Sequence, residues 1–254
     1  MLAAVSQPGG IVLVTGPTGS GKTTTLYALI DHIRTGREKI VTVEDPIEYE
    51  LAGVPQVPVN ERFGVSFASA LRALLRQDPD VLLVGEIRDE ETAQIATQAA
   101  LTGHLVLSTL HTTDAAGALT RMMDLGIAPY LVASTVSVVL AQRLVRRVCR
   151  DCGSPLTAPA PSARAAAPAS SAAATATGCE ACRFSGYRGR VGLYELLRMD
   201  DTIREAVVRR ESAAQLRAMA IRRGMRTLED DGRRLVEARI TTMAEVRRVT
   251  VTAV

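Results

Sequence analysis

The first pattern in the chain that can do chemistry is the segment Gly16-Pro-Thr-Gly-Ser-Gly-Lys-Thr23, which has the P-loop spacing of glycine, four residues and Gly-Lys-Thr. Glycines let backbone N–H groups turn inward around phosphate oxygens, and the following helix directs its N-terminus at the same anion. Lys22 is expected to reach the β- and γ-phosphates, and the Thr23 hydroxyl to coordinate Mg²⁺. The predicted nucleotide site consists of Gly16, Pro17, Thr18, Gly19, Ser20, Gly21, Lys22, Thr23 and Thr24.

Two acidic residues are candidates for the other groups that nucleotide hydrolysis needs. Glu86 follows the apolar run Val81–Val84. Ligands bind at this edge of a parallel sheet, so the Glu86 carboxylate can hold Mg²⁺ directly or through water. Glu48 lies just past the apolar run Ile40–Val43 and can act as the general base for a water near the γ-phosphate. The alternative for the acidic segment 44–50 is a solvated turn.

Two of the three histidines flank one apolar run, residues 105–109. His111 follows the C-terminal end of this run and is therefore positioned to face the phosphates. His104 precedes the run and lies at its opposite end. For each histidine the alternative is a structural residue whose hydrogen bonds are satisfied, and for His104 both interpretations stay open.

The four cysteines form two Cys-x-x-Cys pairs, which are Cys149 with Cys152 and Cys179 with Cys182. A two-residue spacer lets both thiolates of a pair turn onto one metal ion, so the two pairs suit tetrahedral Zn–S₄ coordination. Disulfides are not expected in a cytosolic protein. Polar neighbours disfavour the alternative of four free cysteines in a core.

Alternating strand and helix patterns must position these residues. The predicted strands are 11–15, 40–43, 81–84 and 105–109, and the predicted helices are 22–34, 67–75 and 90–101. Nearly continuous apolar strands that alternate with helices indicate a mainly parallel sheet with helices on both faces. The predicted fold class is therefore α/β.

Composition divides the chain into three expected segments. Residues 1–145 form the P-loop α/β core, residues 146–192 a tetracysteine metal-binding module, and residues 193–254 a region of short helices. Within the module, residues 156–177 are almost only Ala, Pro, Ser and Thr and are expected to be a disordered loop. Capping boxes in the last segment predict two helix starts, one at Ser212 with Gln215 and one at Thr242 with Glu245.

Composition, apolar run lengths and the N-terminal pattern disfavour the membrane-spanning and secreted classes. Hydrophobic residues make up 47% and charged residues 22%, as in soluble globular proteins. No apolar run approaches the ~18–20 residues that span a bilayer, and the N-terminus has no signal-peptide pattern. Residues 1–140 carry a net charge of −6 and residues 141–254 one of +9. This asymmetry indicates either an anionic partner or solvated helix faces.

Four segments, in chain order, resemble the signature boxes of the secretion ATPase superfamily, in the class of type II secretion and type IV pilus assembly ATPases (GspE/PilB). Gly-Pro-Thr-Gly-Ser-Gly-Lys-Thr-Thr-Thr resembles the Walker A box and Val-Glu-Asp-Pro-Ile-Glu-Tyr the Asp box. Val-Gly-Glu-Ile-Arg-Asp resembles the Walker B box, and Thr-Gly-His-Leu-Val-Leu-Ser-Thr-Leu-His-Thr the His box. The likeness is dense over roughly residues 10–150 and looser up to the C-terminus.

The resemblance implies a RecA-like P-loop core that binds ATP and Mg²⁺ and works as a homo-hexameric ring. It implies Zn²⁺ at the tetracysteine motif, which in the family marks secretion and pilus-assembly ATPases and is absent from retraction ATPases. By position it assigns Lys22 and Thr23 to ATP–Mg²⁺, Glu48 to the catalytic base, Glu86 to the metal and His111 to the γ-phosphate. The role of Arg88, in the Walker B segment, is left open.

The implied function is an ATP-hydrolysing motor for pilus or pseudopilus assembly at the cytoplasmic face of the bacterial inner membrane. The implied partners are an inner-membrane platform and a cytoplasmic adaptor, with no nucleic acid. Family members carry a domain before the core, whereas few residues precede the first strand here, so the chain alone is expected to hydrolyse ATP poorly. The alternatives are a truncated nucleotide-binding assembly subunit and an ATP-driven nucleic-acid translocase.

Overall fold

The computed structural model describes residues 1–6, 9–153 and 178–250, so the loop predicted at 156–177 lies outside the described residues. Contacts divide the chain into two compact units. The first unit is Met1–Gln142 with Tyr194–Thr227, and the second is Arg143–Leu193 with Leu228–Val254. The three-segment division at residues 145 and 192 stays a prediction.

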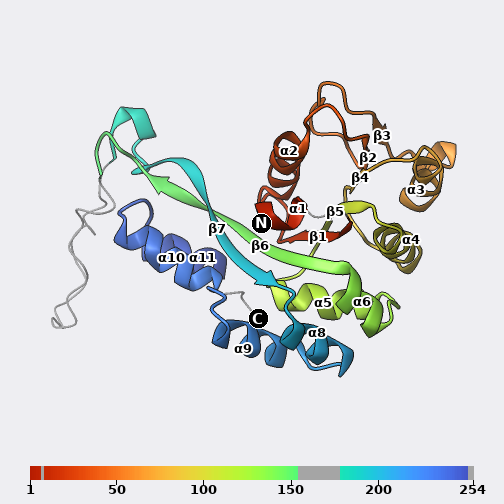
Figure 1. Cartoon of the computed structure of the whole chain (residues 1–254). Coiled ribbons are helices and arrows are strands. Elements are labelled where there is room, and N and C mark those ends of the chain that lie inside the picture. Colours follow the sequence, from red (N-terminus) through yellow and green to blue (C-terminus); the bar gives the residue numbers. More distant parts are fainter. Residues whose placement is uncertain (7–8, 154–177, 251–254) are drawn as a thin grey trace. The chain divides into compact units, whose positions relative to one another are not determined.

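The sheet has the strand order β3-β2-β4-β5-β1-β6-β7 (Figure 1). Its strands are β1 (Gly10–Thr15), β2 (Ile40–Glu44), β3 (Gln56–Pro58), β4 (Val81–Val84), β5 (Leu105–Leu110), β6 (Val136–Val148) and β7 (Tyr187–Arg198). All pairings from β3 to β6 are parallel. The predicted α/β class with a mainly parallel sheet is therefore confirmed.

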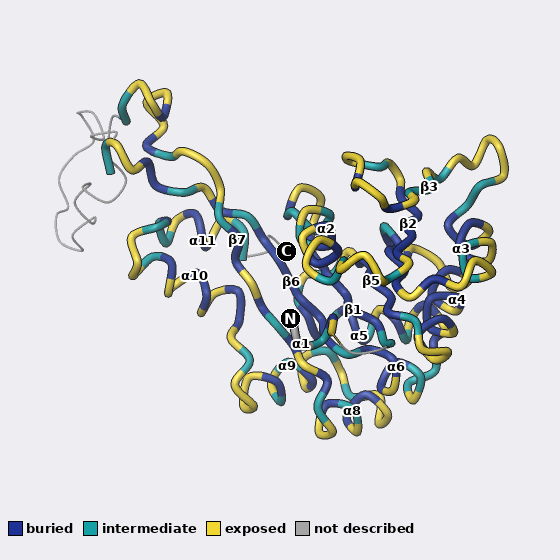
Figure 2. The backbone as a smooth tube through the Cα atoms, turned by 45° about the horizontal axis from the view of Figure 1, so that its top comes forward, coloured by how far each residue is buried: buried dark blue, intermediate teal, exposed yellow. Residues whose placement is uncertain are grey.

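Alternate residues of the central strands serve the two faces of the sheet, as the period of a β-strand requires. On β1, Ile11 and Leu13 join the core formed with helices α3–α6, α8 and α9, whereas Val12 and Val14 join the core formed with α1 and α2. Because both faces are covered, β2, β4 and β5 are buried along their whole length and β1 from Ile11 to Thr15 (Figure 2). This burial explains why their sequences are almost continuously apolar.

Side-chain caps begin most helices of the first unit. A backbone N–H of the first turn donates to the side chain of Ser66, Asp89, Asp114, Asp200 and Ser212, and the Ser212–Gln215 capping box is confirmed. The helices of this unit are α1 (Leu2–Val5), α2 (Lys22–Ile33), α3 (Phe67–Leu75), α4 (Glu90–Leu101), α5 (Ala115–Asp124), α6 (Pro129–Thr135), α8 (Asp201–Val208) and α9 (Ala213–Arg222).

The prediction of short helices from residue 193 was wrong at its start, because β7 continues to Arg198 and α8 begins at Asp201. Leu193, Leu196 and Leu197 have a spacing that also fits one face of a helix. Short apolar runs do not distinguish a helix from a strand. The strands β6 and β7 each run from one unit into the other.

The second unit has a small core of its own, built from Val145, Leu193, Leu228, Leu235 and Val246. Its helices are α10 (Leu228–Glu237) and α11 (Met243–Thr250), and short 3₁₀ turns lie at Glu180–Cys182 here and at Glu61–Phe63 in the first unit. Within the described residues, no helix is both long enough and apolar enough to cross a membrane.

Candidate functional site

Three strand ends meet at one edge of the sheet and carry the candidate nucleotide site. Strand β5 lies between β1 and β4, with Thr15 beside Leu110 and Val84 beside Ser108. The residues that follow these strands are the P-loop after β1, Glu86 after β4 and His111 after β5. Parallel topology therefore brings together the three predicted motifs.

The P-loop is a tight turn between β1 and α2. Gly19 and Gly21 have φ angles of 77° and 85°, a region that favours glycine, and the Ser20 N–H donates to the Pro17 carbonyl at 3.2 Å. The Lys22 ammonium lies against the loop, where it donates to the Gly16 carbonyl at 2.8 Å and the Pro17 carbonyl at 3.1 Å. The cation is thus held beside the turned loop.

Two features of the loop fit a bound phosphate. The Ser20 hydroxyl is buried and has no hydrogen-bond partner among the described residues. Open space surrounds the Cα of Gly19, because nothing lies within 4 Å of a Cβ placed there. A buried hydroxyl without a partner is unfavourable, and a phosphate oxygen is an acceptor that could satisfy it. The residues therefore fit a nucleotide phosphate.

Glu86 is the centre of a charged cluster at the same edge. Its carboxylate is nearly buried and contacts Arg88 Nη2 at 2.5 Å and His111 Nε2 at 3.3 Å. Arg88 also lies 3.8 Å from Asp45, and the Glu86 carboxylate raises the pKa of Arg88. The structure thus joins the Walker B acid to the predicted His111, and it adds Arg88 and Asp45, for which sequence reasoning assigned no role.

The other two predicted residues form no hydrogen bond or ion pair with this cluster among the described residues. Glu48 is exposed in the loop after β2, and no ion pair among the described residues includes it, whereas Glu86 pairs with Arg88 and His111. His104 lies at the opposite end of β5 from His111, and its Nδ1 contacts the carbonyl of Ala99 at the end of α4 at 2.9 Å. This contact favours the structural interpretation of His104.

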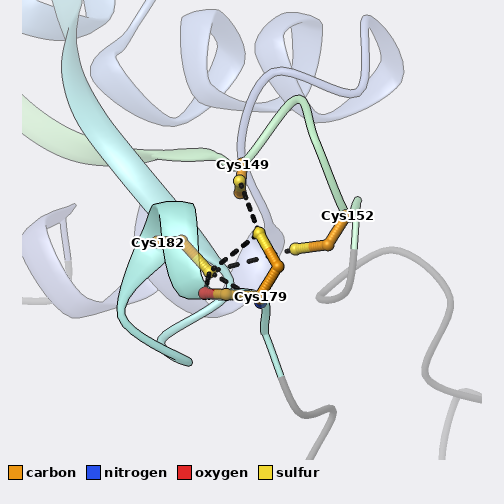
Figure 3. A group of neighbouring side chains, drawn as sticks. All are labelled: Cys149, Cys152, Cys179 and Cys182. Carbon is orange, nitrogen blue, oxygen red and sulfur yellow. Dashed lines mark hydrogen bonds between the residues drawn. The ribbon is translucent and has the colours of Figure 1, made fainter.

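The four cysteine sulfurs come together in the second unit (Figure 3). All four lie within 4.8 Å of one another, and three Sγ–Sγ distances, including Cys149–Cys179 and Cys152–Cys182, are 3.9 Å. Four thiolates at ~2.3 Å from one tetrahedral ion are separated by ~3.8 Å, whereas a disulfide bond is ~2.05 Å long. The cluster therefore fits one zinc ion and not two disulfides.

The backbone around Cys182 favours a thiolate. The N–H groups of Cys179 and Gly186 each donate to Cys182 Sγ at 3.2 Å. Desolvation alone would raise the pKa of this thiol, but these two N–H donors help lower it to about 7. A Cβ on Gly178 would lie 2.5 Å from the same sulfur. Only glycine therefore lets the backbone come this close to the cluster at position 178.

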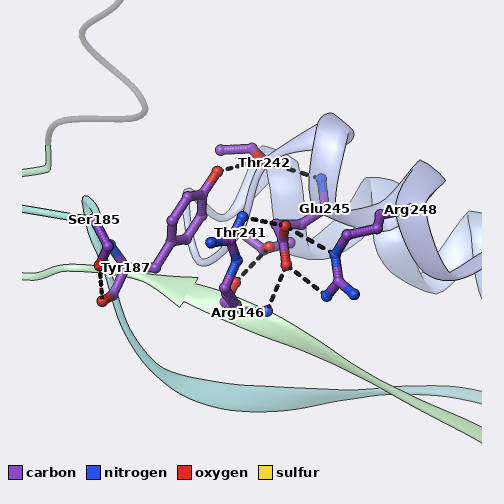
Figure 4. Close-up of polar contacts among 7 residues, drawn as sticks. All are labelled: Arg146, Ser185, Tyr187, Thr241, Thr242, Glu245 and Arg248. Atoms are coloured by element: carbon purple, nitrogen blue, oxygen red, sulfur yellow. Dashed lines mark hydrogen bonds and ion pairs between the residues drawn. The ribbon is translucent and has the colours of Figure 1, made fainter. Parts of the chain in front are cut away.

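A buried carboxylate joins α11 to β6 in the second unit (Figure 4). Glu245 accepts from the backbone N–H of Arg146 at 3.0 Å, from the Arg146 guanidinium at 2.7 Å and from Arg248 at 2.9 Å. The Arg146 guanidinium also stacks 4.2 Å from the centre of the Tyr187 ring. The predicted Thr242–Glu245 capping box is therefore only half formed: the Thr242 hydroxyl accepts from the Glu245 N–H at 3.4 Å, while the Glu245 carboxylate binds arginines.

Replacing Glu245 with glutamine is expected to lower the free energy of unfolding of the second unit by about 3 kcal/mol at pH 7. Desolvation opposes ionisation of Glu245, but hydrogen bonds from Arg146 and Arg248 lower its pKa from 4.5 to about 2. Because the folded-state pKa is depressed, this stabilisation is complete above pH 4.5 and is lost as the pH falls towards 2. Denaturant titrations between pH 7 and pH 3 measure both effects.

The matched control is Glu229→Gln, since Glu229 forms an exposed ion pair with Arg233 on α10. Exposed pairs of this kind contribute only about 0.5 kcal/mol. Equal losses in the two variants, or a Glu245→Gln protein with the wild-type pH dependence, would contradict a stabilising role of the buried carboxylate.

Comparison with known proteins places this geometry in a family. The sequence model of the family described as "Type II/IV secretion system protein" matches residues 1–248. The chain is 51% identical to type II secretion system protein HxcR of Pseudomonas aeruginosa over 97% of this chain and 50% of that protein. It is 50% identical to type II secretion system ATPase E of Vibrio cholerae, over 97% of this chain and 49% of that protein.

Type IV pilus assembly ATPase PilB of Thermus thermophilus is 48% identical over 95% of this chain and 28% of that protein. The chain thus spans about half the length, or less, of these curated relatives. The crystal structure of the pilus retraction motor PilT with bound ADP matches 98% of this chain and 63% of PilT, with a TM-score of 0.73 and 30% identity. The Legionella pneumophila ATPase DotB, at 24% identity and a TM-score of 0.72 over 99% of this chain and 63% of DotB, shares the fold. The chain belongs to the type II/IV secretion system protein family.

Proposed function

We propose that the chain is the ATP-hydrolysing part of a motor subunit that powers pseudopilus or pilus assembly. The observation that carries the proposal is the single sheet edge at which the P-loop, Glu86 and His111 follow three neighbouring strands. Two relatives carry "ATPase" in their names, one from type II secretion and one from pilus assembly, and their identities to this chain are nearly equal. The proposal therefore covers both machines.

Each residue of the site has a definite part in this proposal. The turned P-loop and the Lys22 ammonium hold the β- and γ-phosphates, and a phosphate oxygen satisfies the Ser20 hydroxyl. Thr23 and Glu86 would hold Mg²⁺, which neutralises charge on the phosphates when it is bound. Glu48 takes the proton of the attacking water. His111, 3.3 Å from Glu86, adds a hydrogen-bonding group beside the γ-phosphate.

The proposal extends to assembly and location. Subunits form a homo-hexamer at the cytoplasmic face of the bacterial inner membrane, where they contact a membrane platform and a cytoplasmic adaptor. The family and the names of its members, which are components of secretion and pilus systems, support this part. The geometry of the tetracysteine cluster fits zinc. It supports the assembly class of motor, because the family resemblance links this motif to assembly ATPases and not to retraction ATPases.

Purified protein is expected to release phosphate from ATP slowly but above background in a Mg²⁺-dependent reaction. Mg-ATP is expected to shift its mass by light scattering only partly towards a hexamer. Addition of single-stranded or double-stranded DNA is expected to leave the rate unchanged. Hydrolysis that requires DNA would instead identify a nucleic-acid translocase. Binding of Mg-ATP with no phosphate release would favour a nucleotide-binding assembly subunit and contradict the proposed function.

A further inference from the structure

The carboxylate of Glu44, the last residue of β2, is 2% exposed and binds no cation among the described residues. Its Oε1 accepts from the Thr42 hydroxyl at 2.6 Å and from Gln56 Nε2 at 3.1 Å, and its Oε2 accepts from the Tyr27 hydroxyl. A buried carboxylate is very unfavourable unless donors surround it, so three neutral donors at one side chain indicate a specific role. Because both oxygens are occupied and buried, this role is not that of the base for a water.

Tyr27 connects this carboxylate to the nucleotide site. It is fully buried on α2, the helix that begins with the P-loop residue Lys22. Burial, and next the Glu44 carboxylate, raise the pKa of Tyr27, so the phenol keeps its proton and remains a donor. The Tyr27 ring also packs edge-on against Tyr49, with 4.7 Å between the ring centres. Tyr49 directly follows the candidate base Glu48 in the chain.

Gln56, the first residue of β3, forms hydrogen bonds with the backbone of the loop that contains Glu48. Its Nε2 donates to the Tyr27 hydroxyl at 3.2 Å and to the Tyr49 carbonyl at 3.3 Å, and its Oε1 accepts from the Leu51 N–H at 2.6 Å. Leu51 is buried in the core that contains Tyr27. One network thus binds the backbone of the loop on the C-terminal side of Glu48 to the helix that follows the P-loop.

We propose that Glu44 is a positioning residue, which with Tyr27 and Gln56 holds the Glu48 loop against the P-loop helix and so places the Glu48 carboxylate beside the nucleotide. The inference rests on the proposed function. It also separates the roles of the acids in segment 44–50: Glu44 orders the loop, Asp45 pairs with Arg88, and Glu48 meets the water.

The first test is Tyr27→Phe, which removes one hydroxyl and keeps the buried ring. The expected result is about a ten-fold lower kcat with the Kd of Mg-ATP within about two-fold of wild type, because a hydrogen bond to a charged group is lost while the P-loop is intact. The matched control is Tyr130→Phe, since Tyr130 is an exposed tyrosine of α6, and its kcat is expected to stay at the wild-type value.

The second test combines Tyr27→Phe with Glu48→Gln. If Tyr27 acts through Glu48, the double variant is expected to hydrolyse ATP at the same residual rate as Glu48→Gln alone, because the positioned group is already absent. A further ten-fold loss in the double variant would show that Tyr27 acts independently of Glu48 and would overturn the inference. That additive loss is also the result expected if Tyr27 only stabilises the fold.

The third test is hydrogen–deuterium exchange, which needs no turnover. Tyr27→Phe and Gln56→Ala are each expected to speed exchange in residues 47–55, above all at the Leu51 amide, while the amides of α2 stay protected. Wild-type exchange in this loop together with wild-type kcat in Tyr27→Phe would overturn the inference. By contrast, the absence of Mg²⁺-dependent phosphate release by the wild-type protein would contradict the proposed function, whatever the exchange of the loop.

Discussion

Glu48→Gln is expected to bind Mg-ATP with nearly the wild-type Kd and to hydrolyse it about 10²–10⁴-fold more slowly, the usual contribution of a general base. The amide has the size of the carboxylate but cannot take a proton from water. The Glu48 side chain is exposed and forms no hydrogen bond or ion pair among the described residues, so the substitution is expected to leave folding unchanged. The loss is therefore predicted in kcat and not in affinity or stability.

Glu50→Gln is the matched control, because Glu50 is another exposed acid of the same loop. Single-turnover hydrolysis and equilibrium binding of a fluorescent ATP analogue separate the chemical step from affinity. We expect Glu50→Gln to behave as wild type in both. If Glu48→Gln turned over at the wild-type rate, or if the two variants lost activity equally, Glu48 would not be the base.

The double substitution Cys149→Ser/Cys152→Ser is expected to remove one equivalent of zinc per chain and to unfold the second unit. Structural zinc contributes about 10–16 kcal/mol of apparent binding free energy in zinc-finger peptides, where binding and folding are coupled. The unit has a small core, and the cysteines join the end of β6 to the start of β7 across residues that the structure does not describe. The metal is thus predicted to supply much of this unit's stability.

Metal analysis by mass spectrometry and near-UV circular dichroism during chelation measure these two effects. Ser185→Ala is the control, because the Ser185 hydroxyl donates to the Cys182 carbonyl within the same turn yet supplies no thiolate. This variant is expected to retain its zinc. Wild-type protein that is fully folded without metal would contradict a structural zinc site, and so would full zinc occupancy in the double cysteine variant.

The first half of the fold could be read from the sequence because its strands are buried on both faces. Runs such as Val81–Val84 are continuously apolar for that reason, and β1, α2, α3, β4 and α4 begin and end within a residue or so of the predicted positions. The P-loop could be predicted because its glycines adopt positive φ angles that the turn requires. The cysteine spacing likewise predicted a cluster that the structure assembles.

Long-range partners could not be read in the same way. The sequence shows Glu44 as one of four acids near a strand end, and its burial depends on Tyr27 and Gln56, which come from other elements. Glu245 fits a capping box in the local sequence. In the structure its carboxylate instead accepts two charge-assisted hydrogen bonds from Arg146, which is distant in sequence. Strand β7 was missed because a partly exposed strand with glycines has neither a continuous apolar run nor clear alternation.

The central claim, that the sheet edge formed by the P-loop, Glu86 and His111 hydrolyses Mg-ATP, is tested most directly by single-turnover phosphate release from wild type and Lys22→Ala. Lys22 supplies the cation held by the loop carbonyls of Gly16 and Pro17. The account predicts Mg²⁺-dependent phosphate release by wild type, and in Lys22→Ala at least about ten-fold weaker ATP binding, with release reduced to background, because the charge beside the phosphates is gone. Equal phosphate release by the two proteins would contradict it.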